Sequence, residues 1–436
     1  MTTISSTTPT TTTDAPSASY KSALVVVTTL FFMWGFLTCL NDILVPHLKP
    51  IFDLSYAKIM FIQFAFFSAY FLFSVPMGKV VEWIGYKWTM VGGLLTMGVG
   101  ALLFIPAAAV PSYPLFLFAL MILSAGITAL QVAANPYVAV LGPARTASSR
   151  LNLAQAFNSL GTTIAPYVGG LFILNTAPKS MDEIRQMSSE VLQAYRLQQA
   201  SSIKLPYLAL GLIAIVLGIA IAAFKLPPVP AAERHSGDRS AHTHLWKYRQ
   251  LVLGAIGIFV YVGAEVAIGS FMVNYLSQSN IGNLTEKVAA SYLSFYWGGA
   301  MVGRFIGSAI LQRVPTGTVL GAAAIATCLL VSISMLGTGP VAMWSIILVG
   351  LFNSIMFPSI FTLGIAELGP LTGEGSGIMI MAIVGGAIMP VLVGVLADRI
   401  GIHHSFILPL ICYLYIVYYG FKGSRPTRLR QMPVVS

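Results

Sequence analysis

Two acidic side chains lie inside long apolar stretches of this chain, where a carboxylate is costly. Of the 14 Asp and Glu residues, only Asp42 in "LNDILVP" and Glu265 in "YVGAEVAIGSF" fall in the interior of such stretches. A charged side chain at the centre of a bilayer costs about 2.5–3.5 kcal/mol on the lowest scale, so these residues are rare unless they have a function. Reversible cation binding would fit, because a proton or a sodium ion neutralises the buried charge. The alternatives are a water-exposed helix-terminal acid for Asp42 and a structural carboxyl for Glu265.

Amide side chains recur at helical spacing in two other apolar stretches. Gln131 and Asn135 are four residues apart in "ALQVAANPYVAV", and Asn152, Gln155 and Asn158 follow at intervals of three in "RLNLAQAFNSLG". Residues three or four apart share a helix face. Amides offer both donors and acceptors, which match the neighbouring hydroxyl groups of a sugar. The alternative is that they join membrane helices by hydrogen bonds. A proline after Asn135 is expected to interrupt its helix and to free a backbone carbonyl.

Further candidates are single polar or aromatic side chains. Trp297 and Phe357 could stack on the apolar face of a sugar ring, although membrane aromatics also serve as packing or interface anchors. Arg304 is expected to anchor a helix near the membrane surface, with a gate contact as the alternative. The predicted substrate-binding residues are Asn41, Gln131, Asn135, Gln155, Asn158, Asn274, Trp297, Asn353 and Phe357.

The composition requires a membrane to position these residues. Hydrophobic residues make up 56% of the 436 residues and charged residues only 9%, and the mean hydropathy is +0.82. A soluble domain has about 25% charged residues, so this chain cannot cover itself with polar surface. The formal net charge of +10 comes from basic residues at helix ends and in short loops, so no nucleic-acid partner is expected.

Signatures of enzymes and metal sites are missing from the sequence. It contains no Gly-rich phosphate loop and no H-E-x-x-H pair. Cys39, Cys328 and Cys412 are scattered within apolar stretches and lack the spacing of metal ligands. We therefore expect no enzyme activity, no bound metal and no cofactor other than a coupling ion.

About 20 apolar residues cross a bilayer as a helix, and the sequence contains twelve such stretches. This predicts an all-α integral membrane protein with six spans, a polar linker and six more spans. The predicted spans are residues 22–46, 58–80, 88–109, 114–140, 150–174, 206–224, 251–276, 286–312, 316–338, 341–364, 375–397 and 406–422.

The spans divide the chain into two halves joined by one long polar break. The predicted parts are a disordered polar tail (1–21), a first six-helix bundle (22–224), a cytoplasmic linker (225–250), a second six-helix bundle (251–422) and a C-terminal tail (423–436). Most Lys and Arg residues fall on one side if both termini are cytoplasmic. We therefore expect a multi-pass protein of the cell (inner or plasma) membrane with both termini inside.

The two halves share a short repeat. "GKVVEWIG" (78–85) follows the second span and "GVLADRIG" (394–401) follows the eleventh, and both read G-x-x-x-acid-x-I-G. Glycine permits close helix packing. In the predicted topology the two copies face opposite sides, as inverted repeats would. At helix ends in a six-plus-six chain, the pattern resembles the major facilitator architecture.

Longer motifs narrow the resemblance. "LNDILVPHLKPIF", "LQVAANPYVAVLGP", "SRLNLAQAFNSLGTTIAP" and "FPSIFTLGIAELG" resemble the fucose–galactose–glucose:proton symporter family of the major facilitator superfamily. The resemblance extends from about Phe31 to Arg399 and is greatest to the bacterial glucose/galactose transporter branch. It implies a major facilitator-type fold of twelve transmembrane helices in two pseudo-symmetric six-helix bundles.

The resemblance also implies roles for particular residues. In the L-fucose branch, the aspartate at the position of Asp42 is implicated in proton coupling and substrate recognition, and a second coupling glutamate aligns with Gln131. That branch carries glutamine where Glu265 stands, so the carboxylate and the amide have exchanged halves. Gln155 and Asn158 match the sugar-lining face of the family, and Cys39 occupies a site that is Asn in the fucose branch.

Together these features predict a secondary transporter that imports a hexose of the glucose/galactose class by cation symport. Asp42 and Glu265 are the predicted ion-coupling residues. The coupling ion is expected to be a proton, with sodium as the alternative, and the functional unit a monomer in the lipid bilayer. A multidrug or sugar exporter of the same fold remains the rival interpretation. The sequence does not decide which hexose is preferred or which acid carries the ion.

Overall fold

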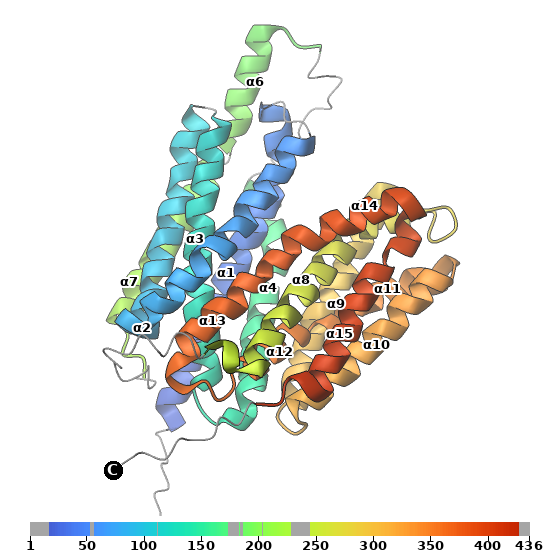
Figure 1. Ribbon diagram of the computed structural model, residues 1–436. Coiled ribbons are helices and arrows are strands. Elements are labelled where there is room, and N and C mark those ends of the chain that lie inside the picture. Colours follow the sequence, from blue (N-terminus) through green and yellow to red (C-terminus); the bar gives the residue numbers. More distant parts are fainter. Residues whose placement is uncertain are drawn as a thin grey trace, which may run out of the picture.

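The computed structural model describes residues 17–52, 56–110, 112–172, 183, 186–202, 204–227 and 245–426. Within its helices, the side chains of residues 17–21, 40–61, 63, 166–172, 196, 199–202 and 286–287 lie outside the description. All regular elements of this described part are helices (Figure 1).

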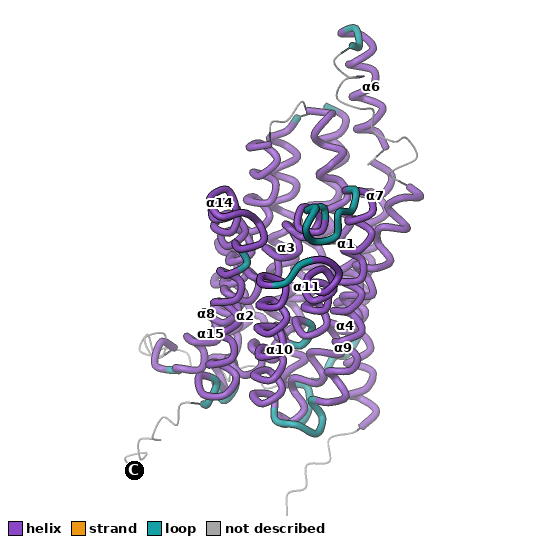
Figure 2. Tube along the Cα trace, turned by 90° about the vertical axis from the view of Figure 1, so that its right-hand side faces the viewer, coloured by secondary structure: helices purple, strands orange, loops and turns teal. Residues whose placement is uncertain are grey.

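The described residues of the first half form five long helices and one shorter helix, α6. The elements are α1 (Ser17–Phe52), α2 (Tyr56–Ala109), α3 (Tyr113–Val140), the 3-10 turn η1 (Ala144–Thr146), α4 (Ala147–Phe172), α6 (Ser189–Ser202) and α7 (Lys204–Ala223). Helix α6 was not predicted. It projects beyond the ends of the other helices (Figures 1 and 2). Its sequence is polar and only 14 residues long, so it does not form an apolar stretch of membrane length.

The second half repeats the pattern with more interruptions. Its helices are α8 (Arg249–Leu276), α9 (Glu286–Ile310), α10 (Thr316–Leu336), α11 (Gly339–Asn353), α12 (Met356–Gly364), α13 (Thr372–Met381), α14 (Gly385–Ser405) and α15 (Ile407–Tyr418). Three short turns complete it, namely η3 (Gly369–Leu371), η4 (Ala382–Val384) and the π-helical η5 (Tyr419–Gly423).

These elements make the twelve crossings of the predicted fold. Helix α2 contributes two, α11 and α12 together form one, and α13, η4 and α14 form another. By length and apolar composition, eight helical stretches among the described residues could each span a membrane, and one of them, Phe64–Ala109, holds two crossings. The crossings that fall below these limits are α4 and α9, which carry polar side chains, and the short α15 with η5.

The repeated sequence motif has the same backbone conformation in both copies. Gly85 breaks α2 at φ 79° and ψ 169°, and Gly401 breaks α14 at φ 82° and ψ 155°. Residues with a side chain rarely adopt such positive φ angles, which explains the final glycine of the motif. Because an odd number of crossings separates the breaks, they lie at opposite ends of the molecule, as inverted copies require.

The crossing predicted over 341–364 is present as one apolar span, Gly339–Gly364, but its helix is interrupted. Helix α11 ends at Asn353 and α12 begins at Met356. Pro358 has no N–H to donate to the carbonyl of Ser354, four residues earlier, so one helical hydrogen bond is missing at this turn. The Ser354 hydroxyl donates to the carbonyl of Leu351 at 2.6 Å. The missing backbone hydrogen bond therefore follows from local sequence.

The two halves approach each other at one end and diverge towards the other (Figure 1). At the end where α4 and α13 begin and α9 and α12 end, they are joined by two seams. One seam runs between α4 and α9, and the other between α2 and α13. We call this the closed end. The glycines of the second seam lie against backbone: a Cβ on Gly78 would meet the Gly373 carbonyl oxygen at 3.0 Å, and one on Gly377 the Ser74 carbonyl oxygen at 2.7 Å.

Candidate functional site

The predicted amides of the first half form a buried cluster on α3 and α4. The Gln131 amide nitrogen donates to the Tyr70 hydroxyl of α2 at 2.7 Å. One turn further along α3, the Asn135 side-chain oxygen accepts from Gln155 Nε2 of α4 at 3.5 Å. The Asn135 amide nitrogen is buried and has no hydrogen-bond partner among the described residues. A buried donor without a partner is costly, so this position is suited to an incoming acceptor.

The expected proline effect next to Asn135 takes a different form. Helix α3 continues through Pro136 to Val140, so the predicted interruption does not occur. Since Pro136 lacks an N–H, the carbonyl of Val132 has no regular partner. The Ser376 hydroxyl of α13 donates to that carbonyl at 2.9 Å. The freed carbonyl thus joins the two halves of the molecule.

Asn158 and Asn152 lie on the same helix, α4, but contact other helices. Asn158 Nδ2 donates at 2.9 Å to the carbonyl of Phe31 in α1, so this amide joins two helices of the first half. Asn152 Nδ2 donates at 2.6 Å to the carbonyl of Arg304 in α9, across the seam. Helix-joining contacts were the alternative interpretation of these amides, and they account for both amide nitrogens in this conformation.

Glu265 lies within a cluster of tyrosines in the second half. The Tyr261 hydroxyl, four residues earlier on α8, donates to Glu265 Oε1 at 2.8 Å and lies 2.9 Å from the carbonyl of Asn353. Asn353 Nδ2 donates to the hydroxyls of Tyr296 on α9, at 3.0 Å, and Tyr413 on α15, at 2.9 Å. The Asn353 side-chain oxygen is buried without a partner among the described residues. The second half therefore holds one hydrogen-bond acceptor without a described partner, Asn353 Oδ1, and one carboxylate, Glu265.

The sequence did not predict most of this tyrosine cluster. Tyr261 could have been found, because it lies four residues before Glu265 and so shares its helix face. Tyr413 and Tyr70 come from crossings far away in the chain, and no local pattern points to them.

Other predicted residues lie elsewhere. Asn41 and Asp42 belong to α1, but their side chains lie outside the described residues. Asn274 is exposed, and at about 100° per residue its separation of nine positions from Glu265 places it on the opposite face of α8. The structure therefore does not bring Asn274 to the cluster.

The two predicted aromatic residues differ in their surroundings. Trp297 is 43% exposed and packs edge-on against Tyr296, with ring centroids 5.0 Å apart. It lies one turn from Met301, whose sulfur is 3.7 Å from the Thr163 hydroxyl of α4, so it faces the other half just beyond the seam. Phe357 stacks on Phe361 at 6.1 Å within α12. Trp297 is thus available to a ligand between the halves.

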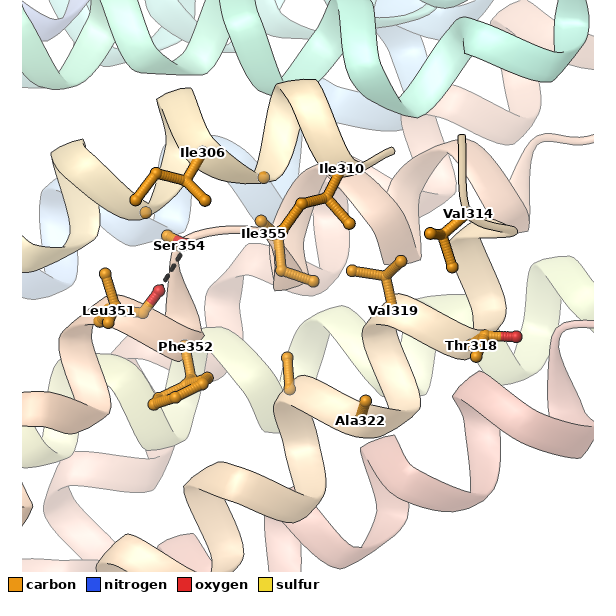
Figure 3. A pocket seen from close by; sticks show the side chains of 13 residues that line it. Ile306, Ile310, Val314, Thr318, Val319, Ala322, Leu351, Phe352, Ser354 and Ile355 are labelled. Carbon is orange, nitrogen blue, oxygen red and sulfur yellow. Dashed lines mark hydrogen bonds between the residues drawn. The ribbon is translucent and has the colours of Figure 1, made fainter. Parts of the chain in front are cut away.

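A cavity of about 430 Å³ lies between α9, α10 and the α11–α12 break. Its lining is mainly apolar, with Ile306, Val319 and Leu351 pointing into it (Figure 3). It contains none of the predicted site residues, and it lacks the convergent polar groups that orient a sugar. Among the described residues, no group of three or more His, Cys, Asp and Glu side chains could hold a metal ion.

Comparison with known proteins assigns this arrangement to a family. A family model described as Major Facilitator Superfamily matches residues 24–384. The chain belongs to the major facilitator superfamily. As a superfamily member built from apolar helices, it is a multi-pass membrane protein.

Relatives of this facilitator confirm the narrower resemblance. It is 50% identical over 424 residues to the glucose/galactose transporter of Brucella abortus, covering 97% of this chain and 99% of the relative. It is 43% identical over 408 residues to a putative glucose/galactose transporter of Helicobacter pylori, covering 92% and 97%. The crystal structure of the Escherichia coli fucose:proton symporter in the outward conformation superposes with a TM-score of 0.88 at 34% identity, covering 93% of this chain and all of that one. These relatives are named as transporters rather than enzymes.

Proposed function

We propose that this facilitator imports a hexose of the glucose/galactose class together with a proton. The main support is the sugar-transporter relationship together with the embedded carboxylate of Glu265, which accepts a hydrogen bond from Tyr261 of the same helix. A proton-coupled transporter needs one group that is charged in one step and neutral in another. Glu265 supplies such a group in α8.

The sugar is expected to bind between the two polar clusters. The unpartnered Asn135 amide nitrogen of the first half can donate to a hydroxyl oxygen, and the unpartnered Asn353 oxygen of the second half can accept from a hydroxyl. Gln131, Gln155 and Asn158 supply further amides, with Trp297 and Phe357 as the aromatic surfaces. Asn41 and Asp42 would complete the site from α1. Asn274 is expected to play no part, because it lies on the other face of α8.

The coupling cycle follows from the cost of a buried charge. A proton bound at Asp42 or Glu265 from the outside removes that cost, and the sugar then fills the gap between the halves. The bundles rock, and the proton and sugar leave on the inside. Sodium is the alternative ion, but it would require several additional carbonyl or hydroxyl oxygens around the carboxylates. No other cofactor enters the cycle.

We place the closed end on the cytoplasmic side. That end carries Arg145, Arg150 at the start of α4, and Arg313, and basic residues favour the cytoplasmic face. Both termini would then be cytoplasmic, in the inner or plasma membrane, and the described conformation would face outwards. Each chain contains both halves of the proposed site, which supports a functional monomer.

Transport by purified protein in proteoliposomes tests the proposal. We expect glucose or galactose to accumulate when the outside is more acidic than the inside, with no requirement for sodium, and to alkalinise the outside. Uptake that depends on sodium at constant pH would replace the proton by sodium. No uptake of any hexose, together with export of lipophilic cations, would instead support a multidrug exporter.

A further inference from the structure

Arg304 on α9 contacts both halves of the molecule. Its guanidinium donates to the Ser159 hydroxyl and, through Nη1 at 3.4 Å, to the Gln155 carbonyl, both on α4. The backbone carbonyl of Arg304 accepts a hydrogen bond from Asn152 Nδ2, which is also on α4. Arg304 is therefore a central contact of the α4–α9 seam at the closed end.

The same side chain holds the break between α11 and α12. Arg304 Nε donates at 3.3 Å to the Ser354 carbonyl, which Pro358 leaves without its regular helical partner. Ser354 directly follows Asn353, the residue that supplies the unpartnered acceptor of the proposed sugar site. One guanidinium thus links the seam to the sugar-facing end of α11.

Glu265 is connected to Arg304 through Tyr261 and the backbone at the α11–α12 break. Tyr261 contacts both Glu265 and the Asn353 carbonyl, and Arg304 binds the carbonyl of the next residue, Ser354. Moving a guanidinium out of water into a seam between helices is costly, and a nearby carboxylate offsets part of that cost. Protonation of Glu265 removes this compensation, so the buried position of the Arg304 guanidinium in the seam becomes less favourable.

The hydrogen bond of Tyr261 depends on whether Glu265 is charged or protonated, and Tyr261 also contacts the backbone next to the α11–α12 break. Its single O–H faces two acceptors, the Glu265 carboxylate at 2.8 Å and the Asn353 carbonyl at 2.9 Å. A phenol can donate its one hydrogen fully to only one of them. The charged carboxylate is the stronger acceptor, and a protonated carboxyl releases the hydroxyl to Asn353.

The other titratable groups near Glu265 come from α9 and α15. Tyr296 and Tyr413 belong to the same cluster through Asn353, whose side chain donates to both hydroxyls. The charged and titratable side chains of α13 and α14 lie near the ends of those helices, namely Glu374, Asp398, Arg399, His403 and His404. Among the described residues, Arg304 is the cation that hydrogen bonds connect to this cluster.

We propose that Arg304 is a positioning residue that couples the charge of Glu265 to closure of the α4–α9 seam. With Glu265 charged, the seam is held and the closed end stays shut. With Glu265 protonated, the seam weakens and that end can open. This inference rests on the proposed function for the source of the proton, but the seam itself can be measured without any sugar.

A cysteine pair placed in the seam reports its closure. The hydroxyls of Ser149 on α4 and Ser308 on α9 lie 3.3 Å apart, so Ser149→Cys with Ser308→Cys can form a disulfide when the seam is closed. The free cysteines Cys39, Cys328 and Cys412 are first replaced by alanine. The rate of disulfide formation under mild oxidation is then measured in purified full-length protein.

The test is a double-mutant cycle between Arg304 and Glu265. Glu265→Gln should slow cross-linking about tenfold when Arg304 is present, and less than twofold in the Arg304→Gln background. Arg304→Lys, which keeps the charge, should retain part of the response. Arg313→Gln, which removes an exposed arginine just after α9, is the matched control and should leave the response intact. Gel filtration checks that each variant is folded.

Two outcomes would overturn the proposal. One is a Glu265→Gln effect of the same size with and without Arg304, and the other is no effect of Glu265→Gln at all. Sugar counterflow by the parent protein is measured in parallel. Its absence would refute the proposed sugar transport while leaving the cross-linking result to decide the role of Arg304.

Discussion

The polar clusters of the two halves differ in chemistry. The first half presents neutral amides, Gln131, Asn135 and Gln155, whereas the second presents one carboxylate, Glu265, surrounded by tyrosines. Amides do not titrate, so the described cluster of the first half can recognise hydroxyl groups but cannot gain a proton. The second cluster can do both. We therefore expect mutations in the two halves to separate sugar affinity from ion coupling.

The largest expected effect is the loss of coupling in Glu265→Gln. Without the carboxylate, the accumulation ratio of sugar under a proton gradient should fall to about one. Counterflow exchange, which needs no gradient, should continue because the glutamine keeps the shape of the site. Paired gradient-driven and counterflow assays in proteoliposomes measure both quantities.

An acid outside both clusters and both seams controls for general effects. Glu190→Gln replaces an exposed acid of α6 and should preserve accumulation. Full accumulation by Glu265→Gln would show that Asp42 alone carries the ion, and would remove the distinction between the halves.

The next largest effect is a loss of sugar affinity in Gln155→Ala. Truncation removes a hydrogen-bonding group and leaves Asn135 without its described partner, which costs about 1–3 kcal/mol, or roughly fivefold to 150-fold in affinity. Coupling stoichiometry should not change. Titration calorimetry with glucose and galactose measures the affinity, and Asn274→Ala is the control that should bind normally. A coupling defect in Gln155→Ala would contradict the division between the halves.

A smaller effect is expected when the carboxylate is moved to the first half. Gln131→Glu combined with Glu265→Gln should accumulate sugar a few-fold better than Glu265→Gln alone. The Tyr70 hydroxyl, 2.7 Å from the Gln131 amide nitrogen, can rotate to donate to the new carboxylate. Gradient-driven uptake by the single and double variants provides the comparison. If the double variant is no better than the single one, the position of the acid is specific to α8.

The smallest effects should come from removing single hydroxyls. Tyr70→Phe in the first half and Tyr413→Phe in the second each delete one hydrogen-bond partner of an amide, worth about 0.5–1.5 kcal/mol. Both should weaken sugar binding by about twofold to tenfold in the same calorimetric assay. A much larger loss in only one of them would show that its hydroxyl contacts the sugar directly.

Much of the fold was predictable because hydropathy and the bilayer act locally. Apolar stretches of membrane length and the paired glycine motifs indicate twelve crossings in two related halves. The missing backbone hydrogen bond at Ser354 was also predictable locally, since Pro358 has no N–H, but its position within an apolar stretch gives no sign of a break. Helix α6 was missed because no apolar pattern marks a helix outside the membrane.

The site was only partly predictable, because its contacts join distant crossings. The costly carboxylate Glu265 and the amides of α3 and α4 could be found from residue type and spacing. Tyr413 and Tyr70 could not, since an aromatic residue in an apolar helix gives no sign of what its hydroxyl contacts. Asn274 shows the converse error, in which a polar residue in the right helix lies on the wrong face.

Helix α6 offers a practical consequence for experiments on the transport cycle. It packs on α1, α2 and α7, all in the first half, and projects beyond the other helices (Figure 2). An antibody fragment that recognises α6 would therefore travel with one bundle as that bundle rocks. Such a fragment would add a rigid mass for imaging without favouring either the outward- or the inward-facing state.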